Sequence, residues 1–279
     1  MRTPTPPSTS TPTSASSRAL VRRRLALGTS AVALAGVLAV IVEGTSATAA
    51  PAPAPAAAKP AATVSLSGWN LTLPVDSSGC QCGDAEQLDP AAVTSPWLTR
   101  NSAGALVFWA PTKGATTPNS AHPRTELVSD DDFTGDGSGT HVLSSTLSVQ
   151  QLPPADDIVI GQIHGGGSSS SIPFVLLHYT SGSLVVWARP SPSAGSTKDA
   201  TLLTGVPLNG SFSYTLTESG KKVEVSVSYD GKQASTTIAL PSGFDGMDLR
   251  FQAGDYQQSD ADQSSTEGGR LTVTALSQS

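Results

Sequence analysis

The feature that most constrains the fold is an alternation of apolar and polar residues, clearest in the segment VEVSVSY at residues 223–229. This period of two predicts a strand with one buried face. Asp230-Gly231 follows, a pair typical of hairpin turns, and residues 233–240 are the expected return strand. A chain built from such units must bury one face of a sheet against another layer.

Short segments of the same kind recur along the chain, whereas amphipathic helical patterns are almost absent. One short helical turn is expected around residues 90–93. About a dozen short strands with so little helix predict an all-β sandwich of two sheets. The other expected strands are residues 64–73, 105–110, 124–129, 141–149, 157–164, 172–179, 184–189, 249–258 and 269–276.

The N-terminal region has the order of an export signal. Arginines 18 and 22–24 precede an apolar run at 25–42 and small residues at 47–50. We expect residues 1–50 to be this signal, cleaved near Ala49 or Ala50, and the protein to be secreted. The alternative is an uncleaved anchor, and the run RRRL at 22–25 also suits twin-arginine export.

Residues 51–62 are almost entirely Pro and Ala and are expected to form an extended linker. The folded domain is then residues 63–279. Residues 1–50 hold five Arg and one Glu of the 16 basic and 22 acidic residues, so the mature chain keeps 11 and 21, a net charge of −10. This balance argues against nucleic acid as a partner. No stable membrane association is expected after signal removal, and a monomer is expected.

The two cysteines are Cys80 and Cys82. In an exported protein they can form a disulfide, which we favour over a metal site because no paired Cys or His ligands accompany them. The run at 130–132 consists of three Asp and is expected to be a solvated turn rather than a calcium site, since it lacks a calcium-loop spacing. We therefore predict no metal and no cofactor.

Three expected strands carry polar side chains in positions that suit chemistry. Alternation places Arg124 and Glu126 on one face of their strand, where the carboxylate can orient the guanidinium. It likewise places Gln162 and His164 on one face, with Ile163 buried beneath them. The Gly/Ser run at 165–171 is expected to be a mobile lid over the site.

The third strand is residues 249–258, in which Leu249, Phe251 and Ala253 are expected to face the core. The opposite face would carry polar side chains, and Gly254 there would leave room for a chain lying across the sheet. The residues expected on that face are Arg250, Gln252, Gly254, Tyr256 and Gln258.

This set of side chains suits removal of a proton alpha to a uronate carboxylate. Arg and an amide can neutralise the carboxylate and stabilise the enolate-like charge that develops. His or Tyr can take the proton, and Tyr can give one to the leaving glycosidic oxygen. The resulting β-elimination requires neither a metal nor a water nucleophile.

The segments RTEL at 124–127, QIH at 162–164 and FQAGDYQQ at 251–258 together resemble the three signature segments of polysaccharide lyase family 7, the alginate lyases. WNLTLPVD at 69–76 and the run at 105–127 are also similar to that family. The resemblance implies a β-jelly roll of two curved antiparallel sheets with the substrate in a concave groove. An acidic polysaccharide, alginate or a related uronan, is the implied partner.

The same resemblance implies the site residues. Arg124 and Gln162 would neutralise the uronate carboxylate, His164 would be the base, and Tyr256 the acid, or acid and base together for a mannuronate-type sugar. An Ile between Gln and His, here Ile163, is associated in the family with guluronate-containing blocks. The residues expected to bind substrate around these four are Glu126, Arg250, Gln252 and Gln258.

Two positions depart from the family pattern. Val128 stands where a second Arg is usual, and Gln252 where a Lys is usual. Both changes remove a cation from the expected groove, so a glucuronan or another uronan is an alternative substrate.

Two other function classes compete. A glycoside hydrolase would need a pair of carboxylates flanking the bond, and Glu126 has no partner carboxylate at such a spacing. A non-catalytic carbohydrate-binding jelly roll would keep aromatic residues for stacking but would not need His164 and Tyr256 together.

Overall fold

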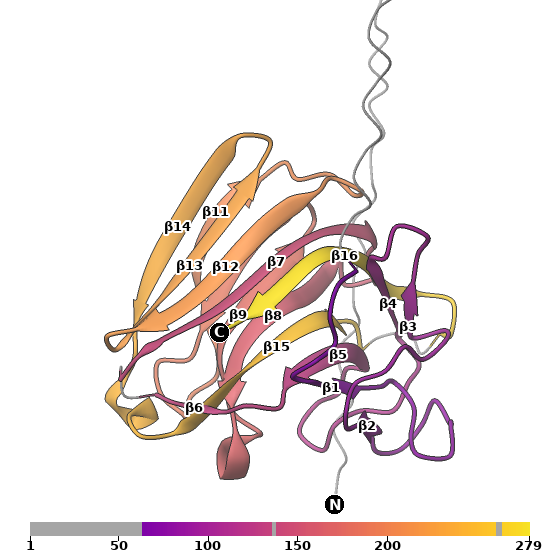
Figure 1. The fold of residues 1–279 in the computed structure, drawn as a ribbon, viewed down its shortest axis with the longest axis horizontal. Helices are drawn as coiled ribbons and strands as arrows, with labels where there is room; N and C mark the ends of the chain where they lie inside the picture. The colour runs from indigo at the N-terminus through magenta and orange to yellow at the C-terminus, as the bar shows by residue number, and fades with distance from the viewer. Residues whose placement is uncertain (1–62, 136–137, 261–263) are drawn as a thin grey trace, which may run out of the picture. The chain divides into compact units, whose positions relative to one another are not determined.

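The computed structural model describes residues 63–135, 138–260 and 264–279, and Figure 1 shows their arrangement. The expected export signal at 1–50 and linker at 51–62 lie outside the described residues. Within the described ranges, no helix has the length and apolar character that crossing a membrane requires. The helical elements there are two 3-10 turns, Gly167–Ser169 and Ser242–Phe244.

The described strands form two antiparallel sheets. The larger has nine strands, and β6 (Phe133–Thr134) joins it by pairing with β15. The order of the other eight is β11 (Thr197–Thr204), β10 (Ser183–Ala188), β9 (Pro173–Thr180), β8 (Asp157–Gly165), β15 (Asp248–Gln257), β5 (Arg124–Ser129), β1 (Trp69–Thr72) and β2 (Gln87–Leu88).

The smaller sheet has seven strands in the described part of the chain. Its centre is β7, whose neighbours β12 and β16 come from distant parts of the sequence. The order is β14 (Lys232–Ala239), β13 (Lys222–Tyr229), β12 (Phe212–Ser219), β7 (Thr140–Gln151), β16 (Gly268–Gln278), β4 (Leu106–Pro111) and β3 (Leu98–Arg100).

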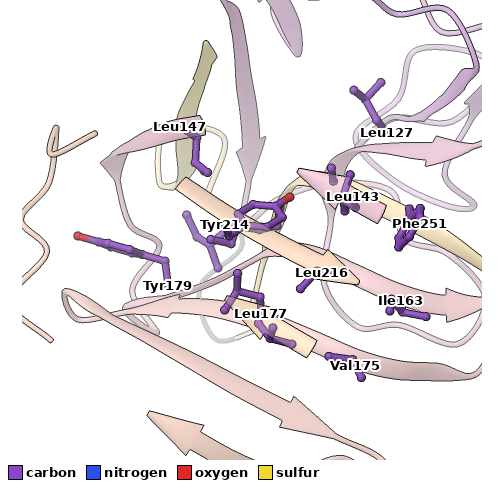
Figure 2. Packing of buried hydrophobic residues seen from close by; sticks show 14 of the residues in the cluster. Leu127, Leu143, Leu147, Ile163, Val175, Leu177, Tyr179, Tyr214, Leu216 and Phe251 are labelled. Atoms are coloured by element: carbon purple, nitrogen blue, oxygen red, sulfur yellow. The ribbon is translucent and has the colours of Figure 1, made fainter. Parts of the chain in front are cut away.

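The core lies between the two sheets. Figure 2 shows Tyr214, Leu216 and Leu143 of the smaller sheet close to Ile163 and Leu177 of the larger. The buried tyrosines keep their hydroxyls paired, since Tyr214 donates to the Ile160 carbonyl at 2.9 Å and Tyr179 to the Val206 carbonyl at 2.8 Å. Apolar residues at every second position therefore meet across one interface, as the alternation predicts.

The prediction of an all-β sandwich of two sheets is confirmed, but two details were wrong or missed. No helical turn forms at residues 90–93, because the Ala91 amide bonds to the distant Trp69 carbonyl at 2.7 Å instead of to its own segment. Strands β11 and β12 were not predicted. The sequence of β12, FSYTLTES, alternates buried and half-buried positions throughout, so its signal was present and overlooked.

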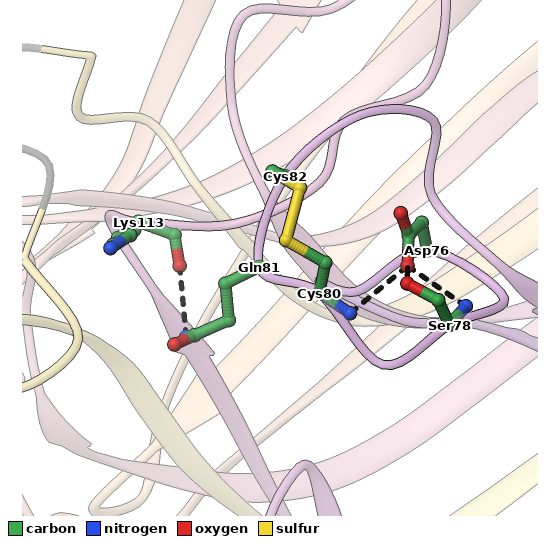
Figure 3. Close-up of a disulfide and its surroundings, with 6 residues drawn as sticks. All are labelled: Asp76, Ser78, Cys80, Gln81, Cys82 and Lys113. Atoms are coloured by element: carbon green, nitrogen blue, oxygen red, sulfur yellow. Dashed lines mark hydrogen bonds between the residues drawn. A yellow bond between two sulfur atoms is a disulfide. The ribbon is translucent and has the colours of Figure 1, made fainter.

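Cys80 and Cys82 form a disulfide, which confirms that expectation (Figure 3). Asp76 organises the same loop, because its Oδ1 accepts hydrogen bonds from the Ser78 amide and the Cys80 amide, both at 2.9 Å, and from the Ser78 hydroxyl. These bonds, the Ser78 hydroxyl's first, lower the pKa of Asp76. Gln81 Nε2 donates to the Lys113 carbonyl at 3.1 Å and ties the loop to the segment leading to β5.

Candidate active site

The outer face of the larger sheet carries a groove of about 480 Å³ that crosses the strands. It runs from β2 over β1, β5, β15, β8 and β9 to the end of β10. Seven of the eight predicted site residues line it, and the eighth, Glu126, lies beneath its floor. The seven are Arg124, Gln162, His164, Arg250, Gln252, Tyr256 and Gln258.

Strand register places these side chains in rows perpendicular to the strands. In what we call the central row, Gln252 lies opposite Val128 on one side and opposite Gln162 on the other. A second row pairs Arg124 with Tyr256, and a third pairs Arg250 with His164. Adjacent strands are about 4.8 Å apart, so residues from three distant segments meet within a few ångströms.

Arg124 is held from two sides. Its Nη1 donates to Glu126 Oε2 at 2.9 Å, and its Cζ lies 3.5 Å from the centroid of the Tyr256 ring. The side chain is buried, and its Nε has no hydrogen-bond partner among the described residues. The guanidinium is therefore fixed in orientation, and the side chain lines the groove, where its charge can meet an anion.

Glu126 is fully buried and joins Arg124 to Gln162. Its Oε1 accepts from Gln162 Nε2 at 2.6 Å, and its Oε2 accepts from Arg124. Burial raises the pKa of this carboxyl, while the charge of Arg124 opposes the rise. The prediction that Glu126 orients Arg124 agrees with these contacts. The side chain exposes no surface to the groove, so it acts by positioning its two partners and not by touching a bound chain.

Gln162 uses both of its amide hydrogens within the protein. Nε2 donates to Glu126 and also to Gln252 Oε1 at 3.1 Å. The negative charge of Glu126 fixes which end of the amide faces it. A substrate carboxylate could therefore accept from Gln162 only by taking the place of Gln252 Oε1. A lysine at position 252 would have no acceptor to offer, so Gln252 changes the hydrogen bonding as well as the charge.

His164 is buried and flanked by cations. Desolvation, together with the charges of Arg124, Arg250 and Arg189, lowers the pKa of His164 to about 4, against the opposing effect of the Gly165 carbonyl. The ring is thus neutral at neutral pH. Its Nδ1 lies 3.2 Å from the Gly165 carbonyl oxygen. A neutral ring that donates from Nδ1 to this carbonyl leaves Nε2 free to accept a proton.

The Tyr256 hydroxyl is held by the loop that precedes β5. The phenol oxygen lies 3.0 Å from Ser120 Oγ, which also bonds to the carbonyl and amide of His122. The half-buried ring is fixed by Arg124 on one face and by this loop at its tip. The arrangement suits a proton donor or acceptor whose position changes little during a reaction.

Of the groove residues that the sequence reasoning missed, two act directly on predicted site residues. Arg189, just after β10, lines the groove, and its charge acts on His164. Ser120 lies in the loop before β5 and bonds to Tyr256 from 136 residues away. Arg189 ends an expected strand and could have been noticed as a third cation on its polar face. Nothing local in the sequence marks Ser120.

Three further expectations are clarified by the geometry. Gly254 does not open the groove, because at its φ of +149° a Cβ would point to Phe108 of the other sheet and to the β5 backbone. Arg250 faces the groove but forms an ion pair with Asp132 at 3.0 Å. Ser170 and Ser171 line the groove, and their loop is tied down where the Gly166 amide bonds to the Asp248 carbonyl. The mobility of this loop stays a prediction.

The sequence matches the family profile described as alginate lyase over residues 64–279. The alginate lyase of Klebsiella pneumoniae is 27% identical over 262 residues, which cover 71% of this chain and 84% of that protein. The structure of alginate lyase PA1167 from Pseudomonas aeruginosa aligns with a TM-score of 0.66 at 30% identity, covering 77% of this chain and 99% of that one.

A family 7 alginate lyase, A1-II′, in complex with a product written GGG, aligns with a TM-score of 0.65 at 26% identity. The alignment covers 80% of this chain and 99% of that one. These matches and the two antiparallel sheets confirm the jelly-roll fold. The chain belongs to polysaccharide lyase family 7, the alginate lyases.

Proposed function

We propose that this chain is an exported enzyme that cleaves alginate, with a preference for guluronate-containing blocks, by β-elimination. The observation that carries the proposal is the convergence of Arg124, Gln162, His164 and Tyr256 on three rows of one groove. Within the proposal, two of these residues neutralise the charge of the substrate and the other two transfer protons.

Charge neutralisation is assigned to Arg124 and Gln162. A uronate carboxylate resists loss of the neighbouring proton because a second negative charge would develop beside the first. Arg124 lines the groove and would bring its positive charge to the carboxylate, and Gln162 would give it the N–H that now bonds to Gln252. Because Glu126 fixes the orientation of Arg124, that charge needs little reorganisation when the reaction begins, whereas Gln252 Oε1 must give way before Gln162 can donate to the substrate.

Proton transfer is assigned to His164 and Tyr256. Nε2 of the neutral His164 takes the proton from the carbon alpha to the carboxylate, and the electron pair released forms the new double bond. The glycosidic bond breaks, and Tyr256 gives its proton to the leaving oxygen. For a sugar that presents its proton on the side of the leaving group, Tyr256 both takes and returns the proton. Atoms and charges balance without a cofactor.

The preference for guluronate-containing blocks rests on Ile163 and on relatives. Ile163 is fully buried, so any influence on the substrate acts through the placement of Gln162 and His164 and not by contact. One solved family 7 structure is described as holding the product GGG and another as holding the substrate GGMG. Both are 26% identical to this chain.

Export after cleavage near Ala49 or Ala50 is part of the proposal. It is supported by the basic, apolar and small-residue order of residues 1–50. An extracellular location also suits a polymer that is too large to enter a cell and a domain with a disulfide. Sequencing the N-terminus of the protein recovered from culture medium would test it, and an intact N-terminus in the cell fraction would contradict it.

A second substrate is favoured by one observation. Val128 and Gln252 lie opposite one another in the central row and place two uncharged side chains beside the catalytic residues. A uronan such as glucuronan, or one with fewer charged sugars, would suit this surface. The enzyme class would stay the same, and only the polymer would differ.

The test follows ultraviolet absorbance of the new double bond while the domain 63–279 is incubated separately with polyguluronate, polymannuronate, mixed alginate and glucuronan. A faster rise on guluronate-containing chains is expected. Tyr256→Phe should lower kcat by about a thousandfold while binding persists, because only the proton donor is lost. A flat trace on all four polymers from a folded protein would contradict the proposal, and full activity of Tyr256→Phe would contradict the role of that residue.

A further inference from the structure

The central row continues beyond the catalytic residues. Gln162 lies opposite Leu176 of β9, Leu176 opposite Trp187 of β10, and Trp187 opposite Lys198 of β11. Partners directly opposite one another in an antiparallel pair project to the same face. Because Leu176 lines the groove, Trp187 and Lys198 stand on the groove face as well.

The neighbours of Trp187 in its own strand support this placement. Val186 and Ala188, on either side of it, belong to the core between the sheets, and Trp187 does not. Leu176 and Val185 are buried and also lie outside that core cluster. Together with the half-buried Trp187, which is the largest of the three, they form an apolar patch on the groove face.

Trp187 is braced on this face by a polar pair. Its ring centroid lies 5.7 Å from that of His178, and His178 Nδ1 lies 2.9 Å from Asp157 Oδ1. His178 lies on β9 and Asp157 on β8, so the pair is anchored on two neighbouring strands. An indole held in this way needs little ordering when a ligand packs against it.

Lys198 adds a positive charge at the end of the row. The side chain is exposed, and within the described part of the chain it forms no ion pair. The mature chain has a net charge of −10, so a cation on the groove face stands out against the overall field. An aromatic ring beside an ammonium group fits a uronate sugar, whose apolar C–H face can pack on the indole while its carboxylate meets the cation.

We propose that Trp187 and Lys198 form a distal subsite that binds a uronate residue of the chain held at the catalytic centre. The proposal rests on the proposed function, in which a uronan lies across the strands. Two strand spacings, about 10 Å, separate Trp187 from Gln162, so a chain must extend beyond the cleaved linkage to reach it. Val128 and Gln252 leave the catalytic centre with fewer cations than is usual in the family. The subsite would offset this loss by strengthening the binding of long chains.

The test measures binding without turnover, in a Tyr256→Phe background. Calorimetric titration with uronate oligosaccharides of increasing length gives Kd for each length. Trp187→Ala is expected to weaken the binding of the long oligosaccharides about tenfold and to leave the shortest that bind unchanged. Lys198→Gln is expected to weaken the same long chains about threefold and to reduce the salt dependence of their Kd.

Trp97→Phe is the matched control, because Trp97 packs against the core and not on the groove face. If Trp187→Ala loses its fold, Trp187→Phe is measured in its place. It keeps an aromatic ring and should retain most of the affinity for long chains. Equal losses at all lengths, or none, would overturn the distal subsite while leaving the lyase intact. Failure of every uronan to bind the Tyr256→Phe protein would overturn the proposed function and the subsite together.

Discussion

At the scale of single residues, the site depends on a buried carboxylate that no substrate can reach. Glu126 accepts from both Arg124 and Gln162, so one negative charge sets the orientation of the two groups assigned to neutralise the substrate. Removing it would free both partners and leave the Arg124 charge uncompensated in a buried place. The groups that would bind the substrate carboxylate are thus positioned by a carboxylate of the protein itself, that of Glu126.

The hydroxyl of Tyr256 gives a prediction at the same scale. Ser120→Ala removes the hydroxyl 3.0 Å from the phenol oxygen. Because one hydrogen bond contributes about 1 kcal/mol, we expect kcat to fall about fivefold to tenfold with KM unchanged. Steady-state kinetics on the preferred polymer would measure both constants.

Ser120→Thr is the control, since it retains an oxygen at the same position and should recover most of kcat. An unchanged kcat in Ser120→Ala would show that this contact does not position the phenol. Equal losses in both variants would point instead to the packing of the loop around His122.

The sequence predicted which side chains share a face but not how they are paired. Alternation alone placed Arg124 with Glu126 and Gln162 with His164, because both members of each pair lie on one strand. The bond from Gln162 to Gln252 joins residues 90 positions apart, and that from Ser120 to Tyr256 joins residues 136 apart. Such contacts depend on strand order, which local periodicity does not encode.

At the scale of elements, β8 connects the core to the site. It carries Gln162 and His164 outward and Ile163 inward, and its bulge near Gly161 is held where Tyr214 donates to the Ile160 carbonyl. The smaller sheet therefore helps to set the position of two site residues, although it contributes none of its own to the groove.

Gly161→Ala tests this connection. A Cβ at this position would lie 2.6 Å from the Tyr214 hydroxyl oxygen and 2.7 Å from its Cζ, so the buried ring or β8 must move. We expect a loss of about 1–3 kcal/mol in the free energy of unfolding, measured by urea denaturation, together with reduced kcat.

Gly195→Ala is the matched control. A Cβ there would meet nothing within 4 Å, so its effect should stay within about 0.5 kcal/mol. Equal stability of the two variants would mean that Tyr214 can shift without cost and does not fix β8.

Elements were predicted well where hydrophobic patterns were strong. The strands that contain the four proposed catalytic residues were expected at nearly their observed bounds. Edge strand β11 was missed because most of its residues are exposed, so its sequence carries little alternation to detect. The expected turn at 90–93 failed for another reason, since small residues favoured a helix locally while a long-range bond to Trp69 decided the backbone.

At the scale of the whole molecule, burial of His164 couples the site to folding stability. The unfolded chain titrates this group near its ordinary value of 6.5, and the folded protein at about 4. The folded state thus favours the neutral ring, and its stability is complete above pH 6.5 and decreases as pH falls towards 4. The shift corresponds to about 3 kcal/mol.

His164→Gln should remove this dependence, because the amide does not titrate. We expect the difference in free energy of unfolding between the wild type and His164→Gln to change by about 3 kcal/mol between pH 7 and pH 4, in urea denaturation at a series of pH values. A constant difference across that range would show that His164 is not titrated as its burial implies. In the active enzyme, kcat/KM should fall on the acid side near pH 4.

The rows that cross the larger sheet have a consequence for how such an enzyme can change. Each of six neighbouring strands, from β5 to β11, contributes one position to the central row. Under the proposed function, a uronan lying across the row would meet a different strand with each of its parts. A substitution at the outer end of the row, such as one at Trp187, would alter the fit of one sugar, whereas one at Gln252 also changes the hydrogen bonding of Gln162 on the next strand. Specificity at the outer positions of such a row is modular: it can drift strand by strand during evolution, or be exchanged in the laboratory, while the hydrogen-bonded ladder beneath stays the same.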